Sequence, residues 1–284
     1  MNDLPLDILV LLNKYYLTSV SRLMLKHTNH CWQQIVGENF NVSTRNIAEK
    51  GHLNVLQWLK DYGHKPNKWT FAYAAKGGHL DILKWLREIE CEGTYWATNY
   101  AAHNGHLDVL MWLKDNGYQL HENAINYAAS GGHLNIIRWL KKTKCPITEK
   151  LTEWAAKSND MDIIIWGYIN DIKISMTCIP SAARNGNTEM LDFLICRRCE
   201  INIEPTTRLA IVHGRMNVLE YLHRNNLIDE SCLNICMYKE NLKILKWVKN
   251  TGYQIIISDY LKEYIFQECK NKRMIAWLKE NNYI

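Results

Sequence analysis

The stretch AAKGGHLDILKWL, residues 74–86, decides the fold, because close variants of it recur along the chain. The same arrangement returns as AAHNGHLDVLMWL at 101–113 and as AASGGHLNIIRWL at 128–140, each time 27 residues further on. A shorter version, GHLNVLQWL, occupies residues 51–59. A fixed interval of this length indicates a repeat architecture, in which each repeat is one supersecondary unit that stacks on its neighbours.

The interval persists in weaker form towards the C-terminal end of the chain. The position of Trp85 is filled in later units by Trp166, Phe193, Tyr221, Trp247 and Trp277. We therefore predict an array over residues 41–284, of about nine units, regular to about residue 200 and irregular after it. A separate helical module is expected over residues 1–40.

Each unit has the pattern of two short helices separated by glycine. In the unit that contains Gly77 and Gly78, we expect a first helix over about 69–76 and a second over about 79–87. Glycine accepts the left-handed conformation that follows a helix end. The second helix carries apolar residues on a wide face, which one unit alone cannot bury. Period-2 alternation is absent, so the predicted class is an all-α helix-turn-helix repeat solenoid.

This pattern resembles the second half of an ankyrin repeat, well over residues 42–200 and loosely over 201–284. Ankyrin repeats run about 33 residues and carry Thr-Pro-Leu-His before the Ala pair. Here the interval is 27 and the matching positions hold WTFA, residues 69–72, so we expect a shortened finger loop. The array is also similar to ankyrin-like families of large DNA viruses. The resemblance implies a binding protein without enzyme activity or cofactor, and a viral protein acting in the host cytoplasm.

The first forty residues lie outside the clear repeat and are similar to an F-box. The residues that fit the Leu-Pro-x-acidic-aliphatic-Leu pattern and its apolar stripe are Leu4, Pro5, Ile8, Leu9 and Leu12. In that family the helices dock the linker subunit of a cullin-type ubiquitin ligase. The resemblance implies an adaptor whose array recruits the substrate. The alternative is a capping unit that seals the first repeat.

Residues that depart from the repeat consensus are the candidates for partner contact on the array. They gather in the loops between units and at the starts of first helices: Lys65, Lys68, Glu92, Tyr95, His121, Glu122, Glu149 and Lys150. A stack of repeats exposes such positions as one long surface. The alternative is that they are ordinary solvated loop residues.

Repeated histidines do not predict a metal site. His52, His79, His106 and His133 occupy one position in successive units. Packed helices lie about 8–10 Å apart and a zinc–nitrogen bond is about 2.0 Å, so neighbours could not share an ion. Each histidine is instead expected to begin its second helix and bond a nearby backbone group. Motifs for nucleophilic, metal or nucleotide chemistry are absent, so neither an enzyme nor a cofactor is predicted.

Composition fits a folded, non-membrane binding protein. Of 284 residues 47% are hydrophobic and 22% charged, and no apolar run reaches the length of a membrane span. Nine cysteines without a secretory signal indicate free thiols and a cytoplasmic location. The net charge of +5 is concentrated in residues 239–284, which makes weak nucleic-acid binding an alternative. The leading interpretation is a ligase adaptor, with a passive scaffold or decoy as the other protein-binding possibility.

Overall fold

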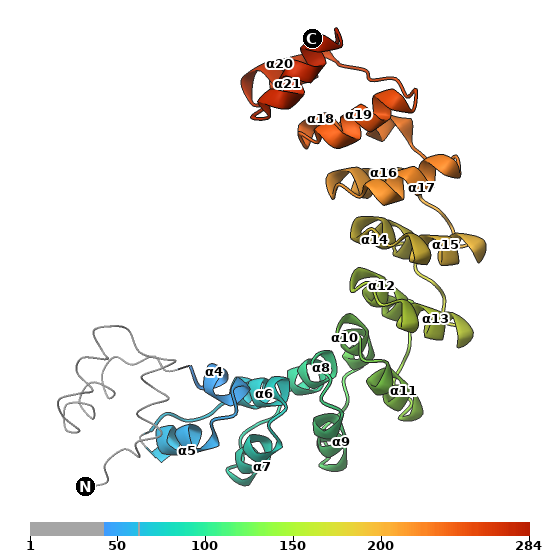
Figure 1. Ribbon diagram of the computed structural model, residues 1–284. Coiled ribbons are helices and arrows are strands. Elements are labelled where there is room, and N and C mark those ends of the chain that lie inside the picture. The colour runs from blue at the N-terminus through green and yellow to red at the C-terminus, as the bar shows by residue number, and fades with distance from the viewer. Residues whose placement is uncertain (1–42, 62) are drawn as a thin grey trace, which may run out of the picture. The chain divides into compact units, whose positions relative to one another are not determined.

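The computed structural model describes residues 43–61 and 63–284, and in these ranges it contains α-helices, one short 3-10 helix and no strand (Figure 1). The chain divides into two compact units between Ile136 and Ile137. The helices come in consecutive pairs joined by tight turns, so the prediction of an all-α helix-turn-helix repeat solenoid is confirmed.

In the first unit the first helices of successive pairs pack directly on one another, α4 on α6, α6 on α8 and α8 on α10. These first helices are α4 (Thr44–Glu49), α6 (Lys68–Gly77), α8 (Tyr95–His103) and α10 (Ala124–Ser130). The second helices are α5 (Leu53–Asp61), α7 (Leu80–Glu88), α9 (Leu107–Asp115) and α11 (Leu134–Lys142), the last of which contains the boundary between the units.

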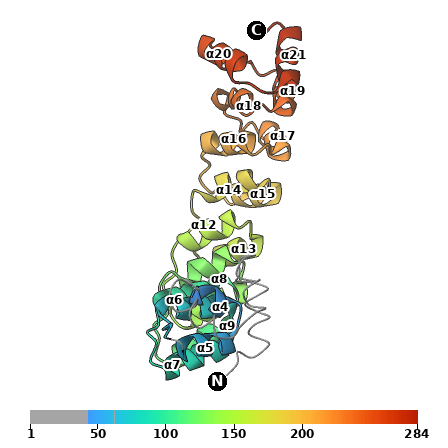
Figure 2. The same cartoon turned by 90° about the vertical axis from the view of Figure 1, so that its left-hand side faces the viewer.

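The second unit continues the pairing, with first helices on one side and second helices on the other (Figure 2). The first helices are α12 (Lys150–Lys157), α14 (Cys178–Asn185), α16 (Ile203–Val212), α18 (Ile235–Tyr238), which follows the 3-10 helix η1 (Glu230–Cys232), and α20 (Asp259–Gln267). The second helices are α13 (Met161–Ile169), α15 (Thr188–Cys196), α17 (Met216–Arg224), α19 (Leu242–Asn250) and α21 (Lys272–Glu280).

The Ala pair explains why first helices approach closely. Ala74 and Ala75 of α6 are fully buried, and a methyl side chain lets the neighbouring helix backbone come near. Asn67 caps the start of α6 by accepting from the backbone N–H groups of Trp69 and Thr70. Gly78 ends the helix in the left-handed conformation, with φ of 78°. The helix therefore begins and ends within one residue of the predicted bounds.

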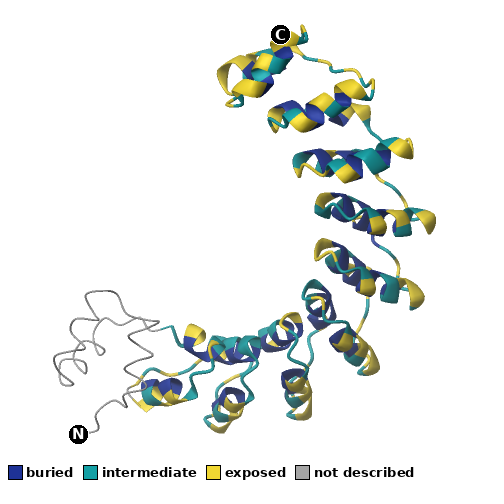
Figure 3. Ribbon diagram, viewed as in Figure 1, coloured by how far each residue is buried: buried dark blue, intermediate teal, exposed yellow. Residues whose placement is uncertain are grey.

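Second helices supply the rest of the core through their aliphatic stripes (Figure 3). In α7, Ile82, Leu83 and Leu86 are fully buried. Trp85 is only half-buried, as is each Trp at the equivalent position in the other repeats. The aliphatic residues therefore fill the core, and the indole rings lie at its edge.

Histidines at the start of second helices link one repeat to the one before it. The Nε2 of His79 donates to the carbonyl oxygen of Glu49 at 3.0 Å, and His133 does the same to His103 at 3.0 Å. Because a carbonyl oxygen can only accept, Nε2 carries the proton. This confirms that the histidines bond backbone groups, with the acceptor in the preceding repeat.

Candidate partner-binding surface

Aromatic side chains of three successive first helices form a continuous surface in the first unit. We call this the aromatic face and define it as Trp69 and Tyr73 of α6, Tyr95, Trp96 and Tyr100 of α8, and Tyr127 of α10. Residues four apart lie on one side of a helix, which brings each Trp beside the Tyr one turn later. Because the interval is 27, Tyr73, Tyr100 and Tyr127 take the same position in three neighbouring helices.

The rings contact one another from helix to helix. The ring centroids of Trp69 and Trp96 lie 6.4 Å apart, and those of Tyr73 and Tyr100 lie 5.7 Å apart edge-on. Trp96 also lies 6.2 Å from Tyr127, again edge-on. These separations fall in the range of attractive aromatic pairs. The face therefore runs across three repeats without interruption.

The aromatic face remains accessible to a partner. Tyr95 is 50% exposed and the other five side chains are half-buried. Tyr and Trp lose little conformational freedom when they are covered, and they are enriched at the energetic centres of protein interfaces. A surface of this composition is suited to holding an apolar or mixed protein segment.

Positive groups border the aromatic face at α4 and α6. The Arg45 guanidinium lies 5.3 Å from the Trp69 ring centroid, and the Lys76 ammonium lies 5.2 Å from that of Tyr73. Lys76 also pairs with Glu49 at 2.9 Å, and this bond is the main cause that raises the pKa of Lys76. Burial raises the pKa of the Tyr100 phenol. The Tyr100 phenol is therefore uncharged at neutral pH, and Trp69 and Tyr73 each lie beside a positive group.

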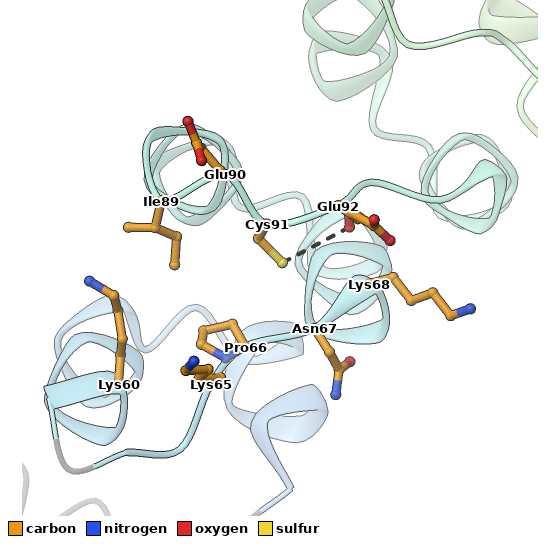
Figure 4. Close-up of a pocket in the computed structure, with 9 residues that line it drawn as sticks. All are labelled: Lys60, Lys65, Pro66, Asn67, Lys68, Ile89, Glu90, Cys91 and Glu92. Atoms are coloured by element: carbon orange, nitrogen blue, oxygen red, sulfur yellow. Dashed lines mark hydrogen bonds between the residues drawn. The ribbon is translucent and has the colours of Figure 1, made fainter.

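A cleft lies between the loops that follow α5 and α7 (Figure 4). We call it the lysine cleft; it has a volume of about 640 Å³ and is lined by Lys60, Lys65, Pro66, Asn67, Lys68, Ile89, Glu90, Cys91 and Glu92. The Lys60 side chain extends into the space between the two loops, Lys65 lies beside Pro66, and Lys68 extends away from that space. Burial raises the pKa of the Cys91 thiol, so it remains protonated at neutral pH.

The structure brings some of the predicted contact residues together. Lys65, Lys68 and Glu92 all line the lysine cleft. Tyr95 stacks on His121 with ring centroids 4.7 Å apart and an interplanar angle of 28°. These five residues therefore belong to two local groups in the first unit.

Other predicted residues lie elsewhere. Glu122 is exposed in the loop before α10, and Lys150 is exposed as the first residue of α12. Glu149 forms an ion pair of 3.2 Å with Lys173 in the second unit. The proposed F-box-like residues Leu4, Pro5, Ile8, Leu9 and Leu12 lie outside the described residues.

Sequence reasoning missed most of the aromatic face. Tyr73, Tyr100 and Tyr127 were recognisable as repeat markers, because each directly precedes an Ala pair. The missing step was the helix geometry: Trp69 and Tyr73, four residues apart, share the side of α6 that is not fully buried. Trp69 and Trp96 stand one turn earlier on that same side.

All eight cysteines in the described part of the chain are free thiols. Within residues 43–61 and 63–284, no group of three or more His, Cys, Asp or Glu side chains is placed to hold a metal ion. In the same ranges, no helix combines the length and the apolar character needed to cross a membrane.

Comparison with known proteins identifies the repeats. Residues 98–204 match the family profile of ankyrin repeats in three copies, and residues 46–87 match that of ankyrin repeats in many copies. Together these stretches cover just over half of the chain. The crystal structure of the human ASB11 ankyrin repeat domain is similar over 73% of this chain and 96% of that one, with 13% identity and a TM-score of 0.34. No curated protein matches the sequence significantly.

Proposed function

This chain belongs to the ankyrin-repeat family, whose repeats are protein–protein interaction modules, and from that premise we propose that its aromatic face binds a segment of a partner protein. The observation that carries the proposal is the run of contacting rings across α6, α8 and α10, from Trp69 to Tyr127. Side chains that only filled a core would be covered, yet these remain partly open to solvent.

The experiment for this proposal uses the full chain with a photo-crosslinking amino acid. One variant carries it in place of Tyr95, which is 50% exposed on α8. The matched control carries it in place of Met111, which is 46% exposed on the second helix α9. We expect one discrete partner to be crosslinked from position 95 only, and to be lost when Trp96 and Tyr127 are both replaced by Ala. Equal yields from both positions would contradict the proposal.

We propose further that the chain is an adaptor that presents its partner to a cullin-type ubiquitin ligase through residues 1–40. The F-box-like stripe from Leu4 to Leu12 supports this role. Free thiols suit the reducing cytoplasm, where such ligases act. The passive scaffold or decoy is the alternative that the next experiment distinguishes.

The adaptor role is tested by a pull-down of the full chain with the purified linker subunit of the ligase. The matched variant is Leu4→Ala, Pro5→Ala, Ile8→Ala, whose circular dichroism must match the parent. Binding by the parent alone supports the adaptor. If the parent does not bind the linker subunit, the adaptor role is contradicted and the alternative is a scaffold that acts through its repeat array.

A further inference from the structure

The lysine cleft has a counterpart at the same repeat position in the second unit. We call it the basic cleft; it has a volume of about 380 Å³ and is lined by Tyr168, Asp171, Ile172, Lys173, Ile174, Arg197, Arg198 and Cys199. Lys173 follows Lys65, and Cys199 follows Cys91, by 108 residues, which is four intervals of 27. The two clefts therefore occupy equivalent positions of the repeat, and the residues that differ between repeats determine the charge of each cleft.

The lining changes charge between the two clefts. Arg197 and Arg198 stand where the lysine cleft has Ile89 and Glu90. The basic cleft thus holds three cationic side chains, with Asp171 as its acidic lining residue. Cations grouped around a hollow attract anionic ligands and favour their correct orientation.

Arg197 is held in place by two aromatic rings. Its guanidinium lies 3.8 Å from the ring centroid of Phe193 and 5.1 Å from that of Tyr168. A guanidinium stacked by its face keeps its edge N–H groups available for a carboxylate. Neither Arg197 nor Arg198 forms an ion pair with any residue that the structure describes. The third cation, Lys173, forms an ion pair with Glu149, and both side chains are at least half exposed to solvent. A carboxylate of a bound ligand could therefore replace Glu149 as the partner of Lys173.

An apolar wall stands beside these charges. Tyr168 is 45% exposed, and Ile172 and Ile174 are half-buried lining residues. A cleft of this size has room for one or two side chains. Acidic groups flanking an apolar side chain match both parts of the site.

From this arrangement we propose that the basic cleft binds an acidic peptide segment of a protein partner, with carboxylates on Arg197 and Arg198 and an apolar side chain against Tyr168. The site is in the other unit from the aromatic face and goes beyond the function proposed above. This proposal does not depend on what the aromatic face binds.

The test measures fluorescence anisotropy of a labelled nonapeptide, eight Glu residues around a central Phe, with the full chain. A peptide with Gln in place of Glu is the ligand control. The cleft variant is Arg197→Gln, Arg198→Gln. The matched protein control, Lys243→Gln, Lys246→Gln, removes two exposed charges from α19 of the same unit. Arg197→Lys keeps the charge but loses the planar, bidentate group.

We expect the cleft variant to weaken binding about tenfold or more, and the α19 variant less than about twofold. Arg197→Lys should be intermediate between the parent and the cleft variant. If the cleft and α19 variants weakened peptide binding equally, the proposal would be overturned, because the peptide would then respond to the overall positive charge rather than to the basic cleft. Failure of the parent to prefer the Glu peptide, or stronger binding of a single-stranded oligonucleotide, would also overturn it.

Discussion

The imidazole Nε2 of His106 donates a hydrogen bond of 3.0 Å to the carbonyl oxygen of Lys76, thirty residues earlier in the chain. That carbonyl is in the last turn of α6, where backbone acceptors lack helical partners. His79 and His133 make the equivalent bond in the neighbouring repeats. In the second unit, the Arg215 guanidinium makes it instead, to Arg184 at 2.9 Å. The bond therefore joins the repeats of His79, His106, His133 and Arg215 to the repeats before them.

His106→Ala should lower the free energy of unfolding by about 1–2 kcal/mol, because the Lys76 carbonyl loses its donor. Urea denaturation of the full chain measures this difference. The control is His103→Ala, which removes an exposed side chain and leaves the carbonyl that accepts from His133. An equal loss in both variants would contradict a role for the inter-repeat bond.

Gly131→Ala should lower the free energy of unfolding by about 3 kcal/mol, since a Cβ there would overlap the carbonyl oxygen of His103 in the preceding repeat. Gly117→Ala is the matched comparison. Gly117 has φ of 82° but open space around it, so only backbone strain of about 1 kcal/mol is expected. Thermal unfolding followed by circular dichroism compares the stability of the two variants. A greater loss of stability in Gly117→Ala than in Gly131→Ala would contradict the close approach of Gly131 to His103.

Low pH should lower the stability of the first unit because His52 becomes protonated. The pKa of His52 lies below its ordinary value of 6.5, first because burial penalises the imidazolium and then because Lys50 and His79 are near. The unfolded chain thus binds the proton more tightly, so stability is full above pH 6.5 and falls as the pH drops below it. Unfolding free energies between pH 7.5 and about 5 should fall less steeply for His52→Gln than for the parent. An unchanged slope would contradict the assignment.

Alkylation should separate the cysteines by burial. Burial raises the pKa of Cys178 to about 11 and that of Cys236 to about 12, whereas Cys196 is exposed. Because the thiolate is the reactive form, iodoacetamide at pH 8 should label Cys196 first and leave the two buried thiols unmodified until denaturant is added. Peptide mass spectrometry reports each site, and early labelling of Cys178 would show that α14 is not packed as described.

The period of the sequence was enough to predict the helix pairs. The Gly77–Gly78 break and the Asn67 cap set the ends of α6, and both signals are local. The Ala pair before each glycine is also visible in the sequence, and it lies on the close-packed side of the first helices. The Ala pair recurs in five consecutive units, from Ala74 to Ala183, so a single sequence displays this feature several times.

The aromatic face and the clefts were harder to predict because they depend on neighbouring repeats together. Trp69 and Trp96 belong to different units, and only the stack brings their rings to 6.4 Å. Likewise, nothing local indicates that Arg197 stacks on Tyr168, because Tyr168 is in α13 and Arg197 directly follows α15. Non-consensus residues pointed to Tyr95 and His121, but their ring contact emerges only from the packed repeats.

Amide hydrogen exchange of the full chain, with and without the partner captured from position 95, tests the central claim most directly. The account predicts slower exchange in α6, α8 and α10, whose first-helix rings the partner would cover, and unchanged exchange in the second helices α7 and α9. Protection confined to the second helices, with α6, α8 and α10 unaffected, would contradict binding at the aromatic face.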